Sequence, residues 1–417
     1  MSTFRVNSTN SEACLAAGSN RLQQPDFVTV ADFGNLALAY RKAAKGKKKR
    51  DDIARFSMHW ESNLLSLRNN LLDGSFQPGG YKIFTVHEKK TRTIMAAPFI
   101  DRIVHHAVCN VVSPVLERSM VPNTCANRPG KGTKAGLELY SRFSLRYRYV
   151  LKCDIRQYFP SIDRDILFAS LGVKVHDPRL LRLIADILNV APLTEAECDW
   201  FPGDTLLTPL ERRRGLPIGN MTSQVWANWY LNGLDHYVMD YCGFGAYIRY
   251  VDDFVIFSDC KKSLNALKQD ITRYLERLRL RIHPEKSRVY RTCDGVPFLG
   301  FRNFRGFRTL LKGNIRRFKR RIRRKIKEVN DGVLPMGSLN SSIAGWCGHA
   351  RMGDTWLLRD SLQRRMLQWR GPGEALPRAA WGLVEQQQRQ PVRRVPEQQQ
   401  PEQQEQQQRV SLCSAVP

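Results

Sequence analysis

The stretch AYIRYVDDFVIF, residues 246–257, places two adjacent acids, Asp252 and Asp253, in the middle of a run that otherwise predicts a buried β-strand. A second β-rich run, YRYVLKCD at 147–154, ends in a third acid, Asp154. Buried carboxylates are costly unless a cation pairs with them. Because neighbouring side chains of a strand point to opposite faces, only Asp252 of the adjacent pair is expected to share a metal directly with Asp154.

Two carboxylates that meet across neighbouring strands form a site for two hard divalent cations. Such ions activate a hydroxyl group and stabilise the leaving oxygens during nucleotidyl transfer. The alternative is a purely structural set of salt bridges, for which the neighbouring Arg249 and Lys152 supply the cations.

The elements around these runs predict a mixed fold. Helical spacing extends from Asp32 to Leu72, and residues 81–98 read as two short strands joined by a charged turn. Further helices are expected near 163–171, 178–190 and 219–239. Strands that alternate with helices, together with hairpins, favour an α/β sandwich over an all-helical fold.

Length and charge narrow the class of protein. The chain has 417 residues, enough for two or three domains at roughly 150 residues each. With 66 Lys and Arg against 39 Asp and Glu, its formal net charge is +27. This imbalance argues against an ordinary neutral metabolic enzyme and indicates a polyanionic partner, although a membrane surface attracts the same charge.

Two segments concentrate the positive charge. RKAAKGKKKR at 41–50 is expected to contact phosphate, with a solvated loop as the alternative. Residues 305–328 carry twelve Lys or Arg and one acid, and an amphipathic helix with an intensely cationic face is expected at 311–328. Its apolar stripe is formed by Leu311, Ile315, Phe318, Ile322 and Ile326. Because the stripe is narrow and lacks Trp, packing on a domain with the cations facing nucleic acid is favoured over a membrane-surface helix.

The remaining composition predicts a protein of a reducing compartment. The ten cysteines form no C-x-x-C pair, so neither a zinc site nor a disulfide framework is expected. No apolar run of about 18 residues is found, and a soluble, cytoplasmic protein without a signal peptide or membrane partners is expected. The Gln- and Pro-rich residues 371–417 are expected to be a disordered tail.

Five further motifs accompany Tyr-Val-Asp-Asp along the chain. They are KKTRTIMAAPFIDRIVHHAV at 89–108, NRPGKGTKAG at 127–136, KCDIRQYF at 152–159, HPEKS at 283–287 and VPFLGF at 296–301. In content and order they resemble the conserved blocks of reverse transcriptases, from about residue 35 to 350. The resemblance implies an α+β right-hand polymerase fold, with fingers, a palm built on an antiparallel sheet with helices behind it, and a helical thumb.

The resemblance also implies domain boundaries. They are a flexible arm at 1–30, N-terminal helices and fingers at 31–146, the palm at 147–300, a basic helical thumb at 301–370 and the tail at 371–417.

The resemblance assigns the chemistry to few residues. The implied catalytic acids are Asp154, Asp252 and Asp253. The resemblance also implies two bound Mg²⁺ ions, for which Mn²⁺ can substitute. Their implied ligands are Asp154, Asp252 and the carbonyl of Ile155. Lys286 is the implied general acid for the departing pyrophosphate, with a plain surface lysine as the alternative.

Other residues are implied to bind the nucleotide or the nucleic acid. Phe159 resembles the steric gate against a ribose 2′-hydroxyl, with a core aromatic as the alternative. The implied triphosphate contacts are Lys90 and Arg92. The implied nucleic-acid contacts are Lys131 and Lys134 in the Gly-rich loop, Gly300 in the primer-grip turn, and Arg316, Arg317, Arg320 and Arg324 in the thumb.

The stretch LPIGNMTSQ at 216–224 discriminates among reverse transcriptases and contributes Ile218, Gly219 and Gln224 to the implied nucleotide site. Most family members, including retron and group II intron enzymes, have Gln where this chain has Ile218 and Pro where it has Gln224. The present form resembles the enzymes of diversity-generating retroelements, which copy a template-repeat RNA into cDNA with errors at adenine. The apolar Ile218 penalises a mispaired nucleotide less than a hydrogen-bonding Gln would, so it is expected to contribute to these errors.

The implied partners are template RNA, the RNA/cDNA hybrid, dNTPs and a small, basic, oligomeric accessory protein, in a bacterial or phage-encoded system. An antiphage reverse transcriptase is the alternative. A non-catalytic nucleic-acid scaffold is disfavoured because it has no use for the three acids. A group II intron protein is disfavoured because no maturase-type or endonuclease segment is visible after residue 350.

Overall fold

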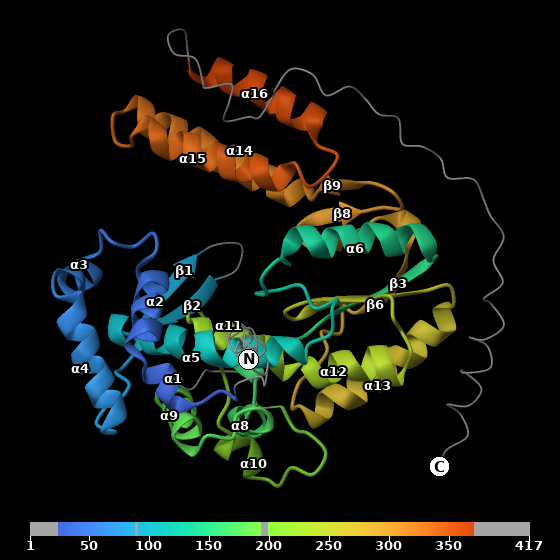
Figure 1. Ribbon diagram of the computed structural model, residues 1–417. Helices are drawn as coiled ribbons and strands as arrows, with labels where there is room; N and C mark the ends of the chain where they lie inside the picture. Colours follow the sequence, from blue (N-terminus) through green and yellow to red (C-terminus); the bar gives the residue numbers. More distant parts are fainter. Residues whose placement is uncertain (1–23, 88–90, 193–198, 371–417) are drawn as a thin grey trace, which may run out of the picture. The chain divides into compact units, whose positions relative to one another are not determined.

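The computed structural model describes residues 24–87, 91–192 and 199–370 (Figure 1). Most of the expected N-terminal arm, Lys90 and the expected tail at 371–417 lie outside these residues. The chain divides into two compact units. The first comprises Met1–Arg320 and Ala350–Trp356, and the second comprises Arg321–His349 and Leu357–Pro417.

The first unit begins with helices that pack around one long helix. These are α1 (Phe27–Ala31), α2 (Phe33–Ala44), α3 (Asp51–Met58), α4 (Trp60–Leu72) and the long α5 (Phe99–Arg118). The carboxylates of Asp26 and Asp32 cap α1 and α2 by accepting backbone N–H groups. The cationic cluster forms the end of α2 and an exposed turn before α3, so its lysines are available to solvent.

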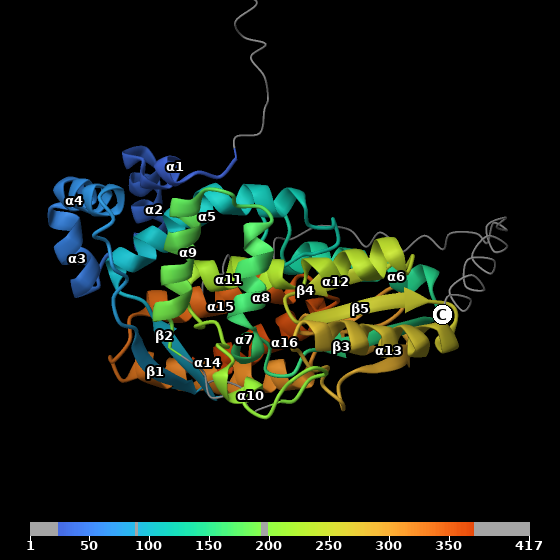
Figure 2. The ribbon, with the colours of Figure 1, turned by 90° about the horizontal axis from the view of Figure 1, so that it is seen from below.

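A four-stranded antiparallel sheet lies at the centre of the first unit. Its order is β4 (Tyr247–Tyr250), β5 (Asp253–Ser258), β3 (Tyr149–Asp154) and β6 (Arg288–Arg291). Helix α6 (Thr133–Arg146) covers one face, and α12 (Asn232–His236) and α13 (Lys261–Arg277) lie on the other (Figures 1 and 2). Side chains alternate accordingly: Val150 and Phe257 belong to the core under α6, while Leu151 and Phe254 belong to the core on the opposite face.

Helices also separate β3 from β4. They are α7 (Tyr158–Ser161), α8 (Arg164–Gly172), α9 (Pro178–Val190), α10 (Thr208–Glu211), α11 (Met221–Tyr230), α12 and the π-helix η1 (Tyr237–Tyr241). The prediction of one helix over 219–239 is wrong in its extent. Gly219 has φ +120° and Asn220 is extended, so α11 begins only at Met221, and Leu231 separates it from α12.

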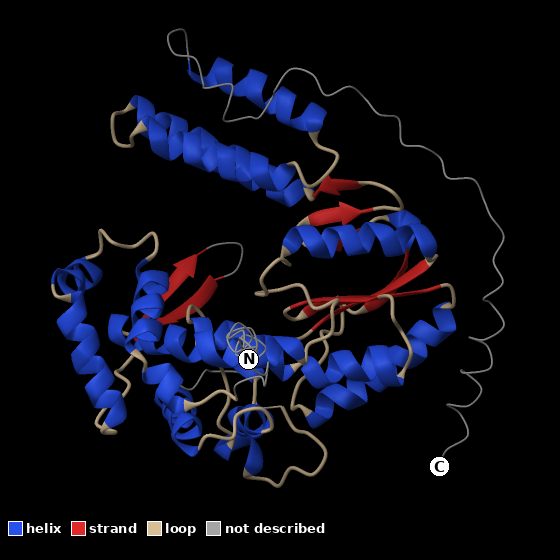
Figure 3. Ribbon diagram, viewed as in Figure 1, coloured by secondary structure: helices blue, strands red, loops and turns tan. Residues whose placement is uncertain are grey.

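Two smaller sheets complete the first unit (Figure 3). One is the hairpin β1 (Lys82–His87) and β2 (Thr91–Ala96). After the short 3₁₀ helix η2 (Thr292–Asp294), β7 (Val296–Phe298), β8 (Phe301–Asn303) and β9 (Arg308–Leu310) form the other. The basic helix expected at 311–328 is present. Because Arg308–Leu310 pairs with β8, helix α14 spans Lys312–Asn330.

The second unit contains the C-terminal part of α14 together with most of α15 (Met336–Ala350) and α16 (Trp356–Arg370). Apolar side chains from these helices are buried, namely Ile322, Ile326, Leu339, Ile343 and Leu362. The ammonium group of Lys325 donates to the hydroxyls of Ser338 (3.0 Å) and Ser342 (2.7 Å) and thereby links α14 to α15.

The observed fold confirms the predicted α+β class, with helices packed behind an antiparallel sheet. Among the described residues, no helix is both long and apolar enough to cross a membrane.

Candidate active site

The Tyr-Val-Asp-Asp motif forms a hairpin turn. β4 ends at Tyr250 and β5 begins at Asp253, so Val251 and Asp252 form the turn between them. The prediction of a single strand with both acids at its centre is wrong. Val251 adopts φ +60°, a left-handed conformation that a β-branched residue rarely takes. The surroundings must therefore hold this turn in place.

The strand register brings the acids together. Asp154, the last residue of β3, lies directly opposite Asp253, the first residue of β5. Directly opposed residues of antiparallel strands project from the same face, here the face that α6 covers. Asp252 adjoins them because its carbonyl accepts the backbone N–H of Ile155 at 3.3 Å. Asp252 is a turn residue and Asp253 faces Asp154, so the prediction that only Asp252 lies on the face of Asp154 is wrong.

Electrostatics at this edge of the sheet favour a bound cation. Burial raises the pKa of Asp253 to about 7; the Lys152 ammonium group opposes this shift, and the carboxylates of Asp154 and Asp252 add to it. Lys152 Nζ lies 3.5 Å from Asp253 Oδ1, but that oxygen is buried without a well-formed hydrogen bond. A buried carboxylate oxygen with unused acceptor capacity suits a hard divalent ion.

The segment His283–Ser287 holds Asp154. The backbone N–H of His283 donates to the Asp154 carbonyl at 2.7 Å, and the Asp154 N–H donates to the Ser287 hydroxyl at 3.2 Å. Lys286 Nζ lies 2.6 Å from Asp154 Oδ2, with 42% of the lysine side chain exposed. Lys286 is therefore an ion-pair partner of a predicted catalytic acid, and its general-acid role stays a prediction.

Lys286 and Lys152 form ion pairs with Asp154 and Asp253, respectively. Across 24–87, 91–192 and 199–370, no three His, Cys, Asp or Glu side chains gather into a preformed metal cluster. This agrees with the ion pairs of Lys286 with Asp154 and of Lys152 with Asp253, because each ammonium group neutralises one carboxylate.

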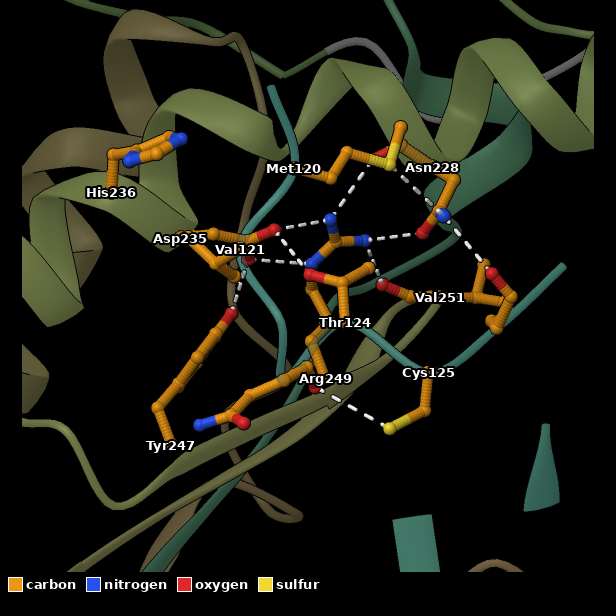
Figure 4. A network of polar contacts seen from close by, with 12 residues as sticks. Met120, Val121, Thr124, Cys125, Asn228, Asp235, His236, Tyr247, Arg249 and Val251 are labelled. Carbon is orange, nitrogen blue, oxygen red and sulfur yellow. Dashed lines mark hydrogen bonds and ion pairs between the residues drawn. The ribbon is translucent and has the colours of Figure 1, made fainter. Parts of the chain in front are cut away.

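Arg249 does not pair with the three acids, contrary to the salt-bridge alternative. Its guanidinium binds the carboxylate of Asp235, and both side chains are fully buried (Figure 4). Of the two cations that the alternative invoked, only Lys152 contacts one of the acids.

Phe159 lies beside the stretch that distinguishes this chain. Its carbonyl accepts the N–H of Leu216 at 2.9 Å, which joins α7 to the start of LPIGNMTSQ. The ring is half-buried, packs against the main core and meets the ring of Tyr158 edge-on at 5.7 Å. Its surroundings are thus compatible with both predicted roles, a gate residue and a packed aromatic.

Residues 218–220 are joined to the β1–β2 hairpin. The N–H of Met95 in β2 donates to the Ile218 carbonyl at 3.2 Å. The side chain of Asn220 donates to the Met95 carbonyl at 3.2 Å and accepts the N–H of Ala97 at 3.4 Å. A Cβ atom on Gly219 would lie 3.3 Å from the Ile94 side chain, so glycine permits this close approach.

The structure therefore places Ile218 and Gly219 against β2, and Phe159 against the start of the same stretch. Gln224 is exposed in the first turn of α11. Arg92 is placed by its backbone in β2, opposite Val86.

Three of the implied nucleic-acid contacts lie at the start of α6 and in the turn between β7 and β8. Lys131 and Lys134 are exposed at the start of α6, where Lys134 pairs loosely with Glu138 at 3.8 Å. Gly300, with φ +86°, forms the turn between β7 and β8. Lys152 Nζ also donates to the Pro297 carbonyl at 2.7 Å, which joins this hairpin to the strand that carries Asp154.

The basic helix carries its arginines as predicted on a polar face. In the first unit, Arg316 and Arg320 are exposed while Phe318 is buried, and Arg317 donates to the side chain of Asn314. In the second unit, Arg324 pairs with Glu328 at 3.4 Å.

Sequence reasoning missed three residues that hold parts of this site in place. Asn220 bonds to β2, Ser287 accepts the N–H of Asp154, and Arg249 donates to the Val251 carbonyl. Each is buried and polar. A polar residue next to a motif and inside an apolar stretch is the signal that could have identified them.

A match to a family model agrees with the family that the motifs resemble. Residues 82–303 match the family described as reverse transcriptase (RNA-dependent DNA polymerase). The chain is 23% identical over 279 residues to protein YkfC of Escherichia coli strain K12, a match that covers 57% of this chain and 70% of YkfC. It is 27% identical over 222 residues to the group II intron-encoded protein LtrA of Lactococcus lactis subsp. cremoris, covering 52% of this chain but only 34% of LtrA. Among solved structures, apo telomerase from Candida tropicalis matches with a TM-score of 0.41 and 11% identity, over 58% of this chain and 52% of that one.

Proposed function

The chain belongs to the reverse transcriptase (RNA-dependent DNA polymerase) family, and from this premise we propose that it copies RNA into DNA at Asp154, Asp252 and Asp253. The observation that carries this assignment is the strand register, which sets Asp154 opposite Asp253 with Asp252 in the adjoining turn. Three carboxylates at one sheet edge have no structural need of one another, because like charges repel. They do suit a reaction that requires bound divalent cations.

Asp154, Asp252 and the Ile155 carbonyl would hold two Mg²⁺ ions, or Mn²⁺ in their place. These residues fit such ions because they are oxygen donors and because the neighbouring Asp253 has a buried oxygen without a well-formed hydrogen bond. Bound there, the ions supply positive charge that favours an ionised primer hydroxyl and a departing pyrophosphate. Lys286 then acts as proton donor to the pyrophosphate, from an ammonium group that begins 2.6 Å from Asp154 Oδ2.

The nucleotide site extends from the acids toward β2. Phe159 excludes a ribose 2′-hydroxyl, while Ile218 and Gly219 line the pocket beside β2; the hydrogen bond from Met95 to the Ile218 carbonyl supports this placement. Lys90 and Arg92 hold the triphosphate, and Gln224 lies at the edge of the site.

Basic residues of the chain contact the template–primer duplex, in keeping with the net charge of +27. The contacts proposed for it are Lys131, Lys134, Gly300, Arg316, Arg317, Arg320 and Arg324.

We further propose that the template is a repeat RNA of a diversity-generating retroelement, copied with errors at adenine. The sequence LPIGNMTSQ supports this subtype, because Ile218 offers only apolar contact where other family members have Gln. A small basic accessory protein would bind the enzyme and its RNA. Similarity to LtrA extends over only 34% of that protein, so the intron-related activity its name indicates is not transferred to this chain.

The first test is cDNA synthesis on the native template RNA with Mg²⁺, four dNTPs and any accessory protein encoded beside the gene. The expected result is metal-dependent cDNA that the Asp252→Ala Asp253→Ala variant does not make. Product that survives this double substitution would refute the catalytic assignment.

Sequencing of the cDNA tests the subtype. Substitutions concentrated at template adenines are expected, and Ile218→Gln should lower their frequency, whereas the matched Ile218→Val should leave it unchanged. Faithful cDNA from the wild type would instead favour an antiphage role for the same polymerase. Unchanged adenine errors in Ile218→Gln would exclude Ile218 as their cause.

A further inference from the structure

A buried ion pair lies directly beneath the Val251–Asp252 turn. Arg249 and Asp235 are both completely inaccessible to solvent, and they join β4 to α12 (Figure 4). Moving two charges out of water is expensive, and apolar residues of similar size often give equal or greater stability. A need for stability alone therefore does not explain this pair.

Every donor of the Arg249 guanidinium is used. Nε and Nη2 donate to the two oxygens of Asp235 at 2.6 and 2.5 Å. Nη1 and Nη2 also donate to the side-chain and backbone oxygens of Asn228, each at 2.9 Å. The last N–H, on Nη1, donates to the carbonyl of Val251 at 3.1 Å. Five donors thus meet five acceptors, and one acceptor is the strained residue of the turn.

Asp235 is equally constrained. Besides Arg249, it accepts the hydroxyl of Tyr247 at 2.6 Å and that of Thr124 at 2.8 Å. Burial lowers the pKa of Arg249, but the adjacent Asp235 carboxylate outweighs burial, so the guanidinium remains charged. The carboxylate therefore fixes the plane of the guanidinium and with it the direction of the N–H toward Val251.

Two hydrogen bonds hold the Val251–Asp252 turn. Arg249 binds the Val251 carbonyl, and the N–H of Ile155 binds the Asp252 carbonyl. Because Val251 has φ +60° without being glycine, loss of either contact would let the turn relax toward an unstrained conformation. Relaxation would move Asp252 relative to Asp154.

We infer that Arg249, oriented by Asp235, is a positioning residue that fixes the Val251–Asp252 turn in the conformation needed for catalysis. Arg249 touches neither substrate nor metal in this assignment and acts only through the backbone of the turn. The effect expected on catalysis rests on the proposed function, whereas the role of Arg249 in holding the turn does not.

The test compares Arg249→Lys with Arg212→Lys. Lysine keeps the charge but has a single ammonium group, which cannot reach Asp235 and Val251 with the planar fork of arginine. Arg212 is the matched control, because it is also buried and paired with a buried aspartate, Asp204, at 2.8 Å, but in the segment before α11. Thermal melting should show comparable destabilisation of the two variants.

Arg249→Lys should lower kcat by about 100-fold with little change in the KM for dNTP, as misplacement of a reacting group by about 1 Å would. It should also weaken Mn²⁺ binding, followed through the electron paramagnetic resonance of the free ion, and speed amide hydrogen exchange across residues 250–255. Arg212→Lys should change none of these three properties. If Arg249→Lys does not fold, the apolar variant Arg249→Met Asp235→Leu Tyr247→Phe takes its place.

Unchanged exchange at 250–255, or a kcat equal to that of the control, would overturn the inference. A wild-type protein that makes no cDNA would instead refute the proposed function. In that case the exchange and Mn²⁺ measurements still decide whether Arg249 holds the turn.

Discussion

Replacing Asp101 by Asn should stabilise the protein above pH 6 and not below pH 4. Asp101 lies in the first turn of α5 and is only 5% exposed. Its Oδ2 accepts the N–H of Gly79 at 2.7 Å, in the segment that leads into β1. Burial raises the pKa of Asp101 from 3.8 to about 6, and the hydrogen bond from Gly79 offsets only part of this rise.

The sign of the pH dependence follows from this shift. Between pH 3.8 and 6 the folded state binds more protons at Asp101 than the unfolded state does, so the free energy of unfolding falls as the pH rises. Below pH 3.8 the carboxyl group is neutral in both states. Above pH 6 the folded state carries the full cost of a buried charge, which at about two pKa units amounts to roughly 3 kcal/mol.

Asparagine has the shape of the carboxyl group and keeps an acceptor for Gly79, but it carries no charge. Asp101→Asn should therefore raise the free energy of unfolding at pH 8 by about 1–3 kcal/mol, the lower figure applying if its new N–H groups find no partner. The measurement is urea unfolding followed by tryptophan fluorescence at pH 4 and pH 8.

Asp51→Asn is the matched control, because Asp51 also lies in the first turn of a helix, α3, but is exposed. This change should cost at most about 1 kcal/mol at pH 8, through the helix dipole. The reasoning would be refuted if Asp101→Asn were no more stable than wild type at pH 8, or gained equally at both pH values.

Three further predictions concern the proposed reaction. Lys286→Ala should lower kcat by about 100-fold without weakening dNTP binding, if the ammonium group is a general acid; recovery of the rate at high Mg²⁺ would instead show that it only partners Asp154. Gly219→Ala should raise the KM for dNTP, because a Cβ at φ +120° is strained and would lie 3.3 Å from the Ile94 side chain; steady-state kinetics with an unchanged KM would contradict this. Phe159→Ala should reduce discrimination against ribonucleotides by at least about 10-fold, read from the kcat/KM values for dNTP and rNTP. Retained discrimination would leave Phe159 with only its packing role.

Local patterns were sufficient to predict several elements. The helix over 178–190, the strands within 81–98 and the apolar stripe of the basic helix all appear in the structure, because each depends on side-chain periodicity within one segment. The boundaries that were wrong depend on single residues with special backbone angles. Gly219 and Asn220 delay α11, and the left-handed Val251 interrupts the strand expected over 246–257.

The sequence by itself determined the class of protein and the candidate residues for its chemistry, since the acids and their flanking apolar runs are local and occur in a characteristic order. Tertiary structure decided how the acids face one another. The left-handed Val251 turned an expected strand into a hairpin, and antiparallel pairing then set Asp253 opposite Asp154. Long-range contacts also assigned Arg249 to Asp235 and Lys286 to Asp154, partners that are 14 and 132 residues apart. No local pattern encodes such pairings, because burial in the folded protein selects the partner for each charge.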